Sequence, residues 1–496
     1  MALSQFATAP LSKMIRHLAG RSSLTVVVGA GVSAEAGLPT WNRLVSDLLD
    51  RAGRERLALS DDGARATWIA KILGGESPLG AAAMAEALAG DDLANWIPEA
   101  LYGADAARFA PGPIARQLPV LRAAYGPALR LMTTNYDDLV EQALTDALPG
   151  VAPCVYTGPA GLAALPETDA DHQRVVHLHG YLARDGHAEG TVVLTERDYQ
   201  HVATDDWQRS VVGSALIDGS CLFIGSSLTD PNLLRYLHAH AGPGSPQHYA
   251  IFTRQDAYPK GTPPEVIDAY ENALKARWRS NRLEIVFVDH YAEIALALAE
   301  IARAKRGGAS YRPLPGRLAD WHAQVADELL LPPDFAAAQD FLHFSMNALL
   351  HAAVGTLEPL VGQPVDEVLS ATLWLVDAAG DTLTNWATTD RVHRDPRTID
   401  PIPIDEHSRW VAVRCFCRGT ALGEPRNVYA SRWHFVRGLP LVTRDGIPAG
   451  AITISSMLAE DETILNAMDP AVEVSFDDTI QELALYILDL ASIGTT

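Results

Sequence analysis

A glycine-rich stretch near the N-terminus, VVVGAGVSAEAGLPTW at residues 26–41, is the first feature suited to binding a reactive ligand. After three valines the chain reads G-A-G-V-S-A, which fits the G-x-G-x-x-G/A pattern of dinucleotide-binding loops if Ala34 takes the last place. A glycine pair after a strand lets backbone N–H groups and a helix N-terminus approach a phosphate. The pattern therefore predicts a nucleotide-binding loop.

The residues after this loop indicate how the ligand is used. A dehydrogenase needs an uninterrupted helix after the third position of the pattern, whereas Gly37 and Pro39 break the chain here. No convincing acidic residue ends a second strand, because Asp47 and Asp50 fall in helical sequence. Both observations disfavour a reusable hydride carrier.

Three further blocks each follow a predicted strand: TTNYDDL from Thr133, VVHLHG from Val175 and LFIGSSLTDPNL from Leu222. Together with GAGVSAEAGLPTW they resemble the sirtuin signature, in which G-A-G-x-S precedes a Gly-hydrophobic-Pro turn, and they come in the sirtuin order. The resemblance covers residues 10–305. It implies a sirtuin-like α/β fold with a Rossmann-like parallel sheet, and NAD as the ligand.

The resemblance also implies two loops around the NAD molecule. One loop wraps the NAD phosphates, and a second loop of glycine and hydroxyl residues completes the cofactor site. The matching residues are Gly29, Ala30, Gly31 and Ser33 in the first loop, and Gly225, Ser226 and Ser227 in the second.

Three side chains match the reactive part of the family's site. Asn135 matches the asparagine beside the nicotinamide ribose, Asp137 matches the aspartate that recognises the nicotinamide amide, and His179 matches the catalytic base. Cleavage of the ribose–nicotinamide bond passes through an oxocarbenium-like centre, which needs an oriented acceptor and a dry pocket. Asn135 can orient a ribose hydroxyl or a water molecule, and a histidine can take the proton.

Two departures make peptide deacylation doubtful. Zinc-dependent deacylases of the family carry two cysteine pairs, whereas the four cysteines of this chain form no such pairs, so no metal is expected. Thr40 and Trp41 replace the usual aromatic residue and arginine. The pattern is more similar to bacterial Sir2-like NAD-hydrolysing effectors of anti-phage defence, in which water replaces the acyl-lysine and the cell's NAD pool is depleted.

Simpler structural roles remain as alternatives for these residues. Ser33 could cap the short helix after the loop, and Asn135 and Asp137 could form only an Asx-type turn. His179 could be a core histidine whose ring nitrogens are hydrogen-bonded within the protein.

Two neighbouring polar residues are expected to be structural. His177, two residues before the matched histidine, is assigned a mostly structural role. Asp230 precedes Pro231, and an N-cap followed by proline at the first helical position explains both residues, so no chemistry is assigned to Asp230.

The first part of the chain alternates short strands with helices, as expected of a parallel sheet buried on both faces. A segment rich in Ala, Leu and Trp, residues 43–128, is too long for one crossover helix and predicts a helical insertion. The predicted strands are 24–28, 129–133, 175–178, 221–224, 249–252 and 284–288.

The domain boundaries follow from changes in this pattern. We expect an NAD-binding domain over residues 1–305, a charged, Gly/Pro-rich linker over 306–320 and a smaller α+β domain over 321–496. In the last domain we expect a hairpin in ATLWLVDAAGDTLTNWAT, with further helices and strands at 335–360, 410–418, 433–441, 449–455 and 472–490.

The order of elements in residues 321–496 resembles GAF-type sensor domains. The resemblance implies that a small ligand can lie between the sheet and its helices. The alternative is a dimerisation module that binds no ligand.

The composition of the chain disfavours several classes of function. Sixty-one acidic residues against 39 basic ones give a net charge of -22, which disfavours general nucleic-acid binding and attraction to an anionic membrane. No run approaches the roughly 20 apolar residues of a membrane span. Scattered cysteines fit buried thiols in a reducing cytoplasm, where we place the protein.

The combined prediction is an NAD+ glycohydrolase (an NAD+ nucleosidase) that uses NAD as its substrate. We expect it to deplete NAD in anti-phage defence by abortive infection, as a homo-oligomer regulated through its C-terminal domain by a small-molecule or phage-derived trigger. Two alternatives stay open: a sirtuin-type protein deacylase or ADP-ribosyltransferase, and a non-catalytic NAD or ADP-ribose sensor.

Overall fold

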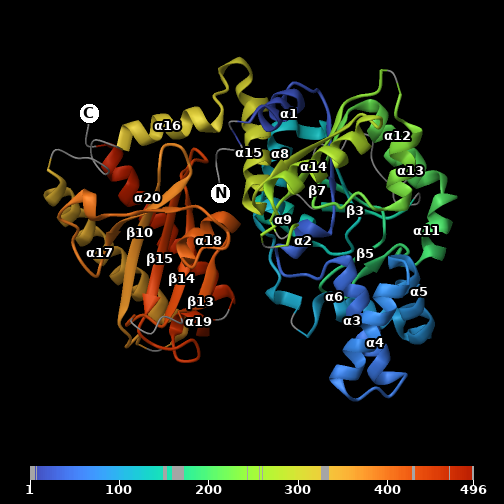
Figure 1. Ribbon diagram of the computed structural model, residues 1–496, viewed down its shortest axis with the longest axis horizontal. Helices are drawn as coiled ribbons and strands as arrows, with labels where there is room; N and C mark the ends of the chain where they lie inside the picture. Colours follow the sequence, from blue (N-terminus) through green and yellow to red (C-terminus); the bar gives the residue numbers. More distant parts are fainter. Residues whose placement is uncertain are drawn as a thin grey trace.

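The chain forms two α/β units that lie side by side along its longest axis (Figure 1). The first unit contains a seven-stranded sheet and the second a six-stranded sheet. The computed structural model describes Phe6 and residues 8–493, apart from residues 105, 149–152, 159–172, 243, 256, 260, 326–333, 363, 427–430 and 469.

The seven-stranded sheet of the first unit is entirely parallel and has the order β3-β4-β2-β1-β7-β8-β9. Six strands confirm the predicted runs. The short edge strand β3 was not predicted, because it begins with a proline and contains one β-branched residue. The bounds are β1 (Leu24–Val28), β2 (Leu129–Thr133), β3 (Pro153–Tyr156), β4 (Gln173–His177), β7 (Ser220–Ile224), β8 (His248–Thr253) and β9 (Leu283–Val288).

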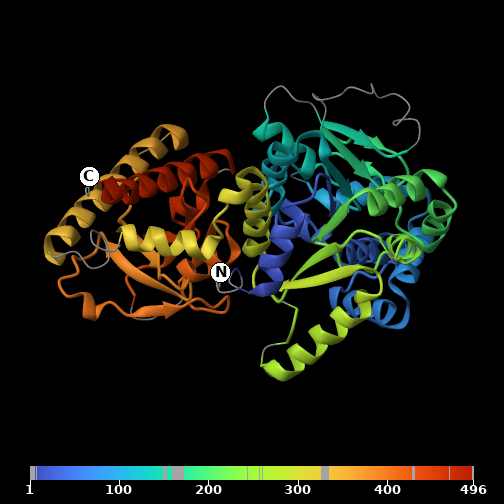
Figure 2. The same cartoon turned by 90° about the horizontal axis from the view of Figure 1, so that it is seen from above.

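Helices cover both faces of this sheet (Figure 2). Alternate residues of β1 show the two layers: Val26 and Val28 join the cluster on one face, and Val27 joins the cluster on the other. The first face packs against α1 (Ala9–Ala19), α7 (Pro113–Arg116), α8 (Leu118–Tyr125), α9 (Leu139–Ala147) and α15 (Tyr291–Gly307). The second face packs against α12 (Asp206–Asp218), α13 (Pro231–Ala239) and α14 (Pro264–Arg279).

The predicted insertion is helical and forms its own apolar cluster, which Trp41 joins at the start of α3. Tyr102 Oη, at the end of α6, donates to the Leu182 carbonyl at 2.6 Å, so this layer is fixed to the segment after β4. Helices α7 and α8, also within the predicted range, instead cover the sheet. The cluster contains α3 (Trp41–Glu55), α4 (Asp62–Gly75), α5 (Pro78–Ala89) and α6 (Leu93–Tyr102).

The connection between the two units is shorter than the predicted linker 306–320. Helix α15 ends at Gly307, one 3₁₀ turn follows at Gly308–Ser310, and α16 (Leu314–Val325) then begins. The glycines and prolines that suggested a linker therefore mark only the turn between two helices.

The second unit confirms the predicted antiparallel sheet with helices, including the hairpin of β10 and β11. Its sheet has the order β12-β11-β10-β15-β14-β13. The strands are β10 (Leu369–Val376), β11 (Thr382–Thr388), β12 (Pro401–Pro403), β13 (Leu422–Pro425), β14 (Phe435–Val442) and β15 (Pro448–Ser456). The helices are α17 (Phe335–Val361), α18 (Val411–Arg418), α19 (Ile464–Ala467) and α20 (Pro470–Ile493).

The second sheet buries both of its faces. One face packs against α17 and α20, and the other packs against α18 and the long helix α15 of the first unit. Close approach at this contact needs a small residue, since a Cβ on Gly419 would lie 2.8 Å from Ala292 Cβ. Arg303 Nη2 of α15 donates to the Asp445 carbonyl, which adds a polar contact between the units.

The described part of the chain shows the burial of the cysteines, the grouping of possible metal ligands and the apolar character of the helices. Cys221, Cys415 and Cys417 are buried thiols, and Cys154 is half-buried. In the described residues, no cluster of three His, Cys, Asp or Glu side chains is arranged to hold a metal ion. No described helix is both long and apolar enough to cross a membrane.

Phe416 of α18 is fully buried between the second sheet and α15, whereas Phe344 of α17 is 72% exposed. We expect Phe416→Ala to lower the free energy of unfolding of the second unit by about 3–5 kcal/mol, because it removes buried apolar area and leaves a cavity. Denaturant unfolding followed by circular dichroism measures this change. Phe344→Ala is the matched control, and equal midpoints for the two variants would contradict the packing described.

Candidate functional site

The predicted site residues follow the ends of four neighbouring strands. The last residues of β1, β2 and β7 are paired in register, with Val28 opposite both Thr133 and Ile224. The last residue of β4, His177, is likewise opposite Thr133. Because the strands are parallel, the segments that follow them meet at one edge of the sheet. The order of connections reverses between β1 and β7, which is where open α/β sheets bind ligands.

The two glycine loops at this edge interlock through their backbones. Gly29 N donates to the Ile224 carbonyl and Gly31 N donates to the Gly225 carbonyl, both at 2.9 Å. A Cβ on Gly29 would lie 2.6 Å from the Gly225 carbonyl oxygen, and Gly225 has a φ of 62°. The glycines thus allow the two loops to touch, and two of their amides are already used for that contact.

The loop after β1 turns as the sequence predicted. Helix α2 (Ala30–Ala34) is only five residues long, and Gly37 has a φ of 92° that ends any continuation. The capping role considered for Ser33 is wrong, because Gly29 is the N-cap and Ser33 lies inside α2. The buried Ser33 hydroxyl instead accepts a hydrogen bond from Asn135 Nδ2 at 2.8 Å.

Asn135 is held in one orientation at the end of β2. Its Nδ2 donates to Ser33 Oγ and also to the Gly29 carbonyl at 3.2 Å. A carbonyl only accepts, so these bonds identify which side-chain atom is the nitrogen. Asn135 Oδ1 is buried and has no hydrogen-bond partner among the described residues, and the residue as a whole is 6% exposed. The side chain therefore keeps one acceptor atom unused inside the protein.

Asp137 lies beside Asn135 and is buried. Its Oδ1 accepts from Leu139 N at 3.2 Å, which is the Asx-type turn considered above, and its carboxylate also bonds the Ser33 hydroxyl. Burial raises the pKa of Asp137 to about 6, although these two hydrogen bonds oppose the shift. The carboxyl group therefore changes protonation state near neutral pH.

His177 has a structural role, as expected: it supports the backbone of Asn135. Its Nδ1 lies 3.0 Å from the Asn135 carbonyl, and its Nε2 lies 2.8 Å from Glu141 Oε1 in α9. Burial alone would lower the pKa of His177, but the Glu141 carboxylate and both hydrogen bonds raise it above its usual value. Both neighbours of the ring accept, so the charged imidazolium satisfies the geometry and fixes the backbone at Asn135.

His179 lies just beyond the end of β4. Its Nε2 lies 2.8 Å from Asp230 Oδ2, and the Tyr199 ring packs edge-on against it with centroids 5.2 Å apart. Asp230 Oδ1 accepts from Leu233 N at 2.7 Å, which confirms the predicted N-cap of α13. Asp230 was assigned no chemistry from the sequence, because capping accounted for it without a second partner.

The predicted residues of the second loop, Gly225, Ser226 and Ser227, do not all face the first loop. Ser226 lies in the interlock, since a Cβ on Gly29 would approach Ser226 Cα to 2.8 Å, and its Oγ accepts from Leu228 N. Ser227 is exposed, and its hydroxyl bonds Thr229 Oγ1 at 2.6 Å. The structure thus brings Gly225 and Ser226 against the first loop and turns Ser227 toward its own loop.

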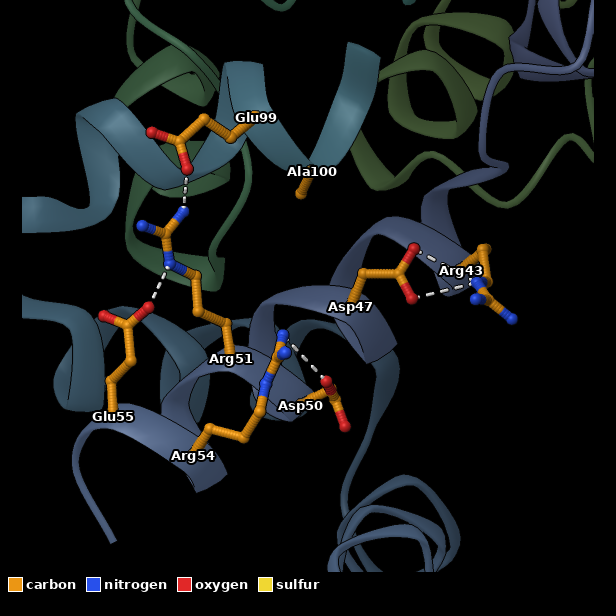
Figure 3. A pocket seen from close by; sticks show the side chains of 8 residues that line it. All are labelled: Arg43, Asp47, Asp50, Arg51, Arg54, Glu55, Glu99 and Ala100. Atoms are coloured by element: carbon orange, nitrogen blue, oxygen red, sulfur yellow. Dashed lines mark hydrogen bonds and ion pairs between the residues drawn. The ribbon is translucent and has the colours of Figure 1, made fainter. Parts of the chain in front are cut away.

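A separate hollow lies on the surface of α3 and α6 (Figure 3). Its cations are each paired: Arg43 with Asp47, Arg54 with Asp50, and Arg51 with both Glu55 and Glu99. The positive charges of the hollow are therefore neutralised by its own carboxylates, and its side chains are more exposed than the buried polar groups at the sheet edge.

Part of the chain matches a known protein family. Residues 130–279 match the family model of the SIR2-like domain. The match includes Asn135, Asp137, His179 and Gly225, and it begins after the first glycine loop. A search of curated protein sequences gave no match.

Several solved structures are similar to parts of the chain. A Sir2 homologue in complex with NAD is 17% identical and covers 60% of this chain and 93% of its own, with a TM-score of 0.32. A "putative GAF sensor protein" from Burkholderia vietnamiensis is 15% identical over 36% of this chain and 90% of its own, with a TM-score of 0.19. The free methionine-R-sulfoxide reductase of Neisseria meningitidis is 17% identical over 37% and 92%, with a TM-score of 0.20.

The interlock of the two loops predicts a steric effect at Gly29. We expect Gly29→Ala to lower the free energy of unfolding by about 1–3 kcal/mol, because the added methyl group must displace the Gly225 backbone. Thermal unfolding measures the change. Gly74→Ala in α4 is the control, since a Cβ there meets nothing within 4 Å; wild-type stability in Gly29→Ala would show that the loops are not in contact.

The raised pKa of Asp137 predicts a pH-dependent stability. Between its usual value of 3.8 and about 6, the folded state keeps a proton that the unfolded state has lost, so stability falls as pH rises through this window. We expect Asp137→Asn to lack this loss, so that its stability relative to wild type rises by up to about 3 kcal/mol from pH 4 to pH 7. Urea unfolding at each pH measures the difference.

The exposed Asp91, substituted as Asp91→Asn, serves as the control for that titration. Its stability relative to wild type should stay constant over the same pH range. A constant difference for Asp137→Asn as well would mean that the Asp137 carboxyl is not buried in the folded protein.

Proposed function

We propose that the chain is an NAD+ glycohydrolase that cleaves NAD and water into nicotinamide and ADP-ribose. The observation that carries the proposal is the free, buried Oδ1 of Asn135 at the strand ends where His179 and the interlocked glycine loops also lie. The SIR2-like match over residues 130–279 supports NAD as the substrate class.

The roles of the reactive residues follow from their contacts. Asn135 Nδ2 is engaged by Ser33 and Gly29, so Asn135 Oδ1 accepts from a ribose hydroxyl or from the attacking water. His179 takes a proton from that group. In this assignment Asp137 binds the nicotinamide amide, and Ser33 acts by holding Asn135 and Asp137 in place.

The two loops are assigned to the NAD phosphates. Gly29 and Gly31 donate their amides to the opposite loop. In this assignment the other backbone groups of residues 29–31 and the hydroxyls of Ser226 and Ser227 contact the pyrophosphate. Interlocked loops form a firm floor for the ligand, because neither can move without the other.

We further propose that NAD depletion by this chain acts in anti-phage defence, as abortive infection in the cytoplasm. The second unit, a GAF-like sensor or oligomerisation domain in this proposal, packs on α15, which also packs on α7 and α8 of the catalytic unit. A bound small-molecule or phage-derived trigger, or assembly into a homo-oligomer, would act on the catalytic unit through this shared helix.

Chromatography of NAD incubated with the purified full chain, over a range of protein concentrations, tests the activity. We expect equimolar nicotinamide and ADP-ribose without any acyl-lysine peptide. Asn135→Ala and His179→Ala should each lower turnover by about 10²-fold or more, because the water is no longer oriented or deprotonated.

His187→Ala is the matched control, since this histidine is exposed and outside the site. It should turn over NAD at the wild-type rate. Wild-type turnover by His179→Ala would overturn the assigned roles. Intact NAD at every concentration, together with unchanged NAD pools in phage-infected cells that express the chain, would overturn the function.

A further inference from the structure

We propose that Asp230 is the positioning residue of His179, fixing the neutral ring with its proton on Nε2 so that Nδ1 is the atom that takes a proton. The inference rests on the proposed function for its catalytic consequence. Its structural part depends only on the pair itself, whose nitrogen and oxygen atoms lie 2.8 Å apart.

Helix capping explains the position of only one of the two carboxylate oxygens of Asp230. The cap uses Oδ1, which accepts from Leu233 N, and serine, threonine or asparagine would cap equally well. The second oxygen, Oδ2, lies 2.8 Å from His179 Nε2. The side chains of Asp230 and His179 are 12% and 7% exposed, so a carboxylate has been placed at a nearly dry site for which capping gives no reason.

The carboxylate is ionised in this position. Burial raises the pKa of Asp230, but His179 and the amides of Leu233 and Asn232 lower it by more, so the pKa lies below its usual value. An ionised carboxylate only accepts hydrogen bonds. His179 Nε2 therefore carries a proton whether the ring is charged or neutral, and in the neutral ring Nδ1 is the one accepting nitrogen.

Two tyrosines also lie near the pair. The Tyr199 hydroxyl hydrogen-bonds the Asp230 side chain, and burial together with the Asp230 charge raises the pKa of Tyr199. Burial likewise raises the pKa of Tyr136, so both phenols stay neutral. The carboxylate of Asp198, at the start of α11 (Glu196–Ala203), is bound by Thr195 N and Oγ1 at 2.9 and 2.8 Å. Asp230 is thus the charged group in contact with His179.

The surroundings hold both partners of the pair. Asn232 Nδ2, in the first turn of α13, donates to the Tyr199 carbonyl at 3.1 Å, which keeps the Tyr199 ring against His179. Val193 N also donates to the His179 carbonyl at 3.0 Å. The helix that begins at Asp230 therefore also holds the residue whose ring packs against the imidazole.

The proton and electron balance of the step is simple. Nδ1 of His179 takes a proton from water, the water oxygen bonds to the ribose carbon, and the ribose–nicotinamide bond breaks with its electron pair on nicotinamide. The imidazolium that forms lies against Asp230, which stabilises its charge. The proton then returns to solvent.

The test compares Asp230→Asn with wild type in the full chain. Asparagine keeps the helix cap but removes the charge, and its amide can donate to Nε2. We expect kcat to fall by about 10²–10⁴-fold with little change in KM for NAD, and the acid limb of the kcat/KM profile to move to lower pH. Asp61→Asn, which changes the N-cap of α4 at Ala64 N and touches no histidine, should change none of these.

Nitrogen-15 NMR of histidine-labelled protein gives a readout that needs no turnover. We expect the His179 signals, identified by their loss in His179→Gln, to show a proton on Nε2 in wild type and a shift toward the other tautomer in Asp230→Asn. A wild-type ring protonated on Nδ1 would overturn the proposal, as would Asp230→Asn with wild-type kcat and pH profile. If wild type cleaves no NAD while the tautomer changes as expected, the proposed function fails and the positioning role stands.

Discussion

The site depends on the contact between two backbone loops at the reversal point of a parallel sheet. Gly29 and Gly31 after β1 and Gly225 after β7 lie so close that a methyl group on any of them would approach backbone atoms to 2.9 Å or less. This contact fixes the Gly29 carbonyl, which orients Asn135, and Ser33 holds the same amide from α2. The loop geometry therefore determines which atom of Asn135 remains available to a ligand.

Around that floor, the reactive residues are held by pairs of buried polar groups. The charged pair of His177 and Glu141 supports the backbone of Asn135, and Asp230 supports His179. Each pair links the end of one strand to a helix, so the positions of the side chains follow from the packing of the whole sheet. The second unit contacts this assembly through α15 and the apolar cluster that α15 shares with the sheet.

Much of this could be predicted from the sequence, because β-branched runs, glycine turns and ordered motifs are local signals. Six strands of the first sheet and four of the second, the short α2 and the cluster of Asn135, Asp137 and Ser33 follow from such signals. The pairs could not be predicted, since His177 with Glu141 and His179 with Asp230 join residues far apart in the chain. Asp230 was missed because a local explanation, the helix cap, was already complete; the linker was overestimated because Gly308 and Pro313 also fit a tight turn between helices.

The most direct test of the account is a crystal structure of the His179→Ala chain with NAD bound. The account predicts intact NAD with its pyrophosphate against the loops of residues 29–31 and 225–227 and its nicotinamide ribose within hydrogen-bond distance of Asn135 Oδ1. NAD bound elsewhere, or with its adenosine end at Asn135, would contradict the assignment of this sheet edge as the catalytic site.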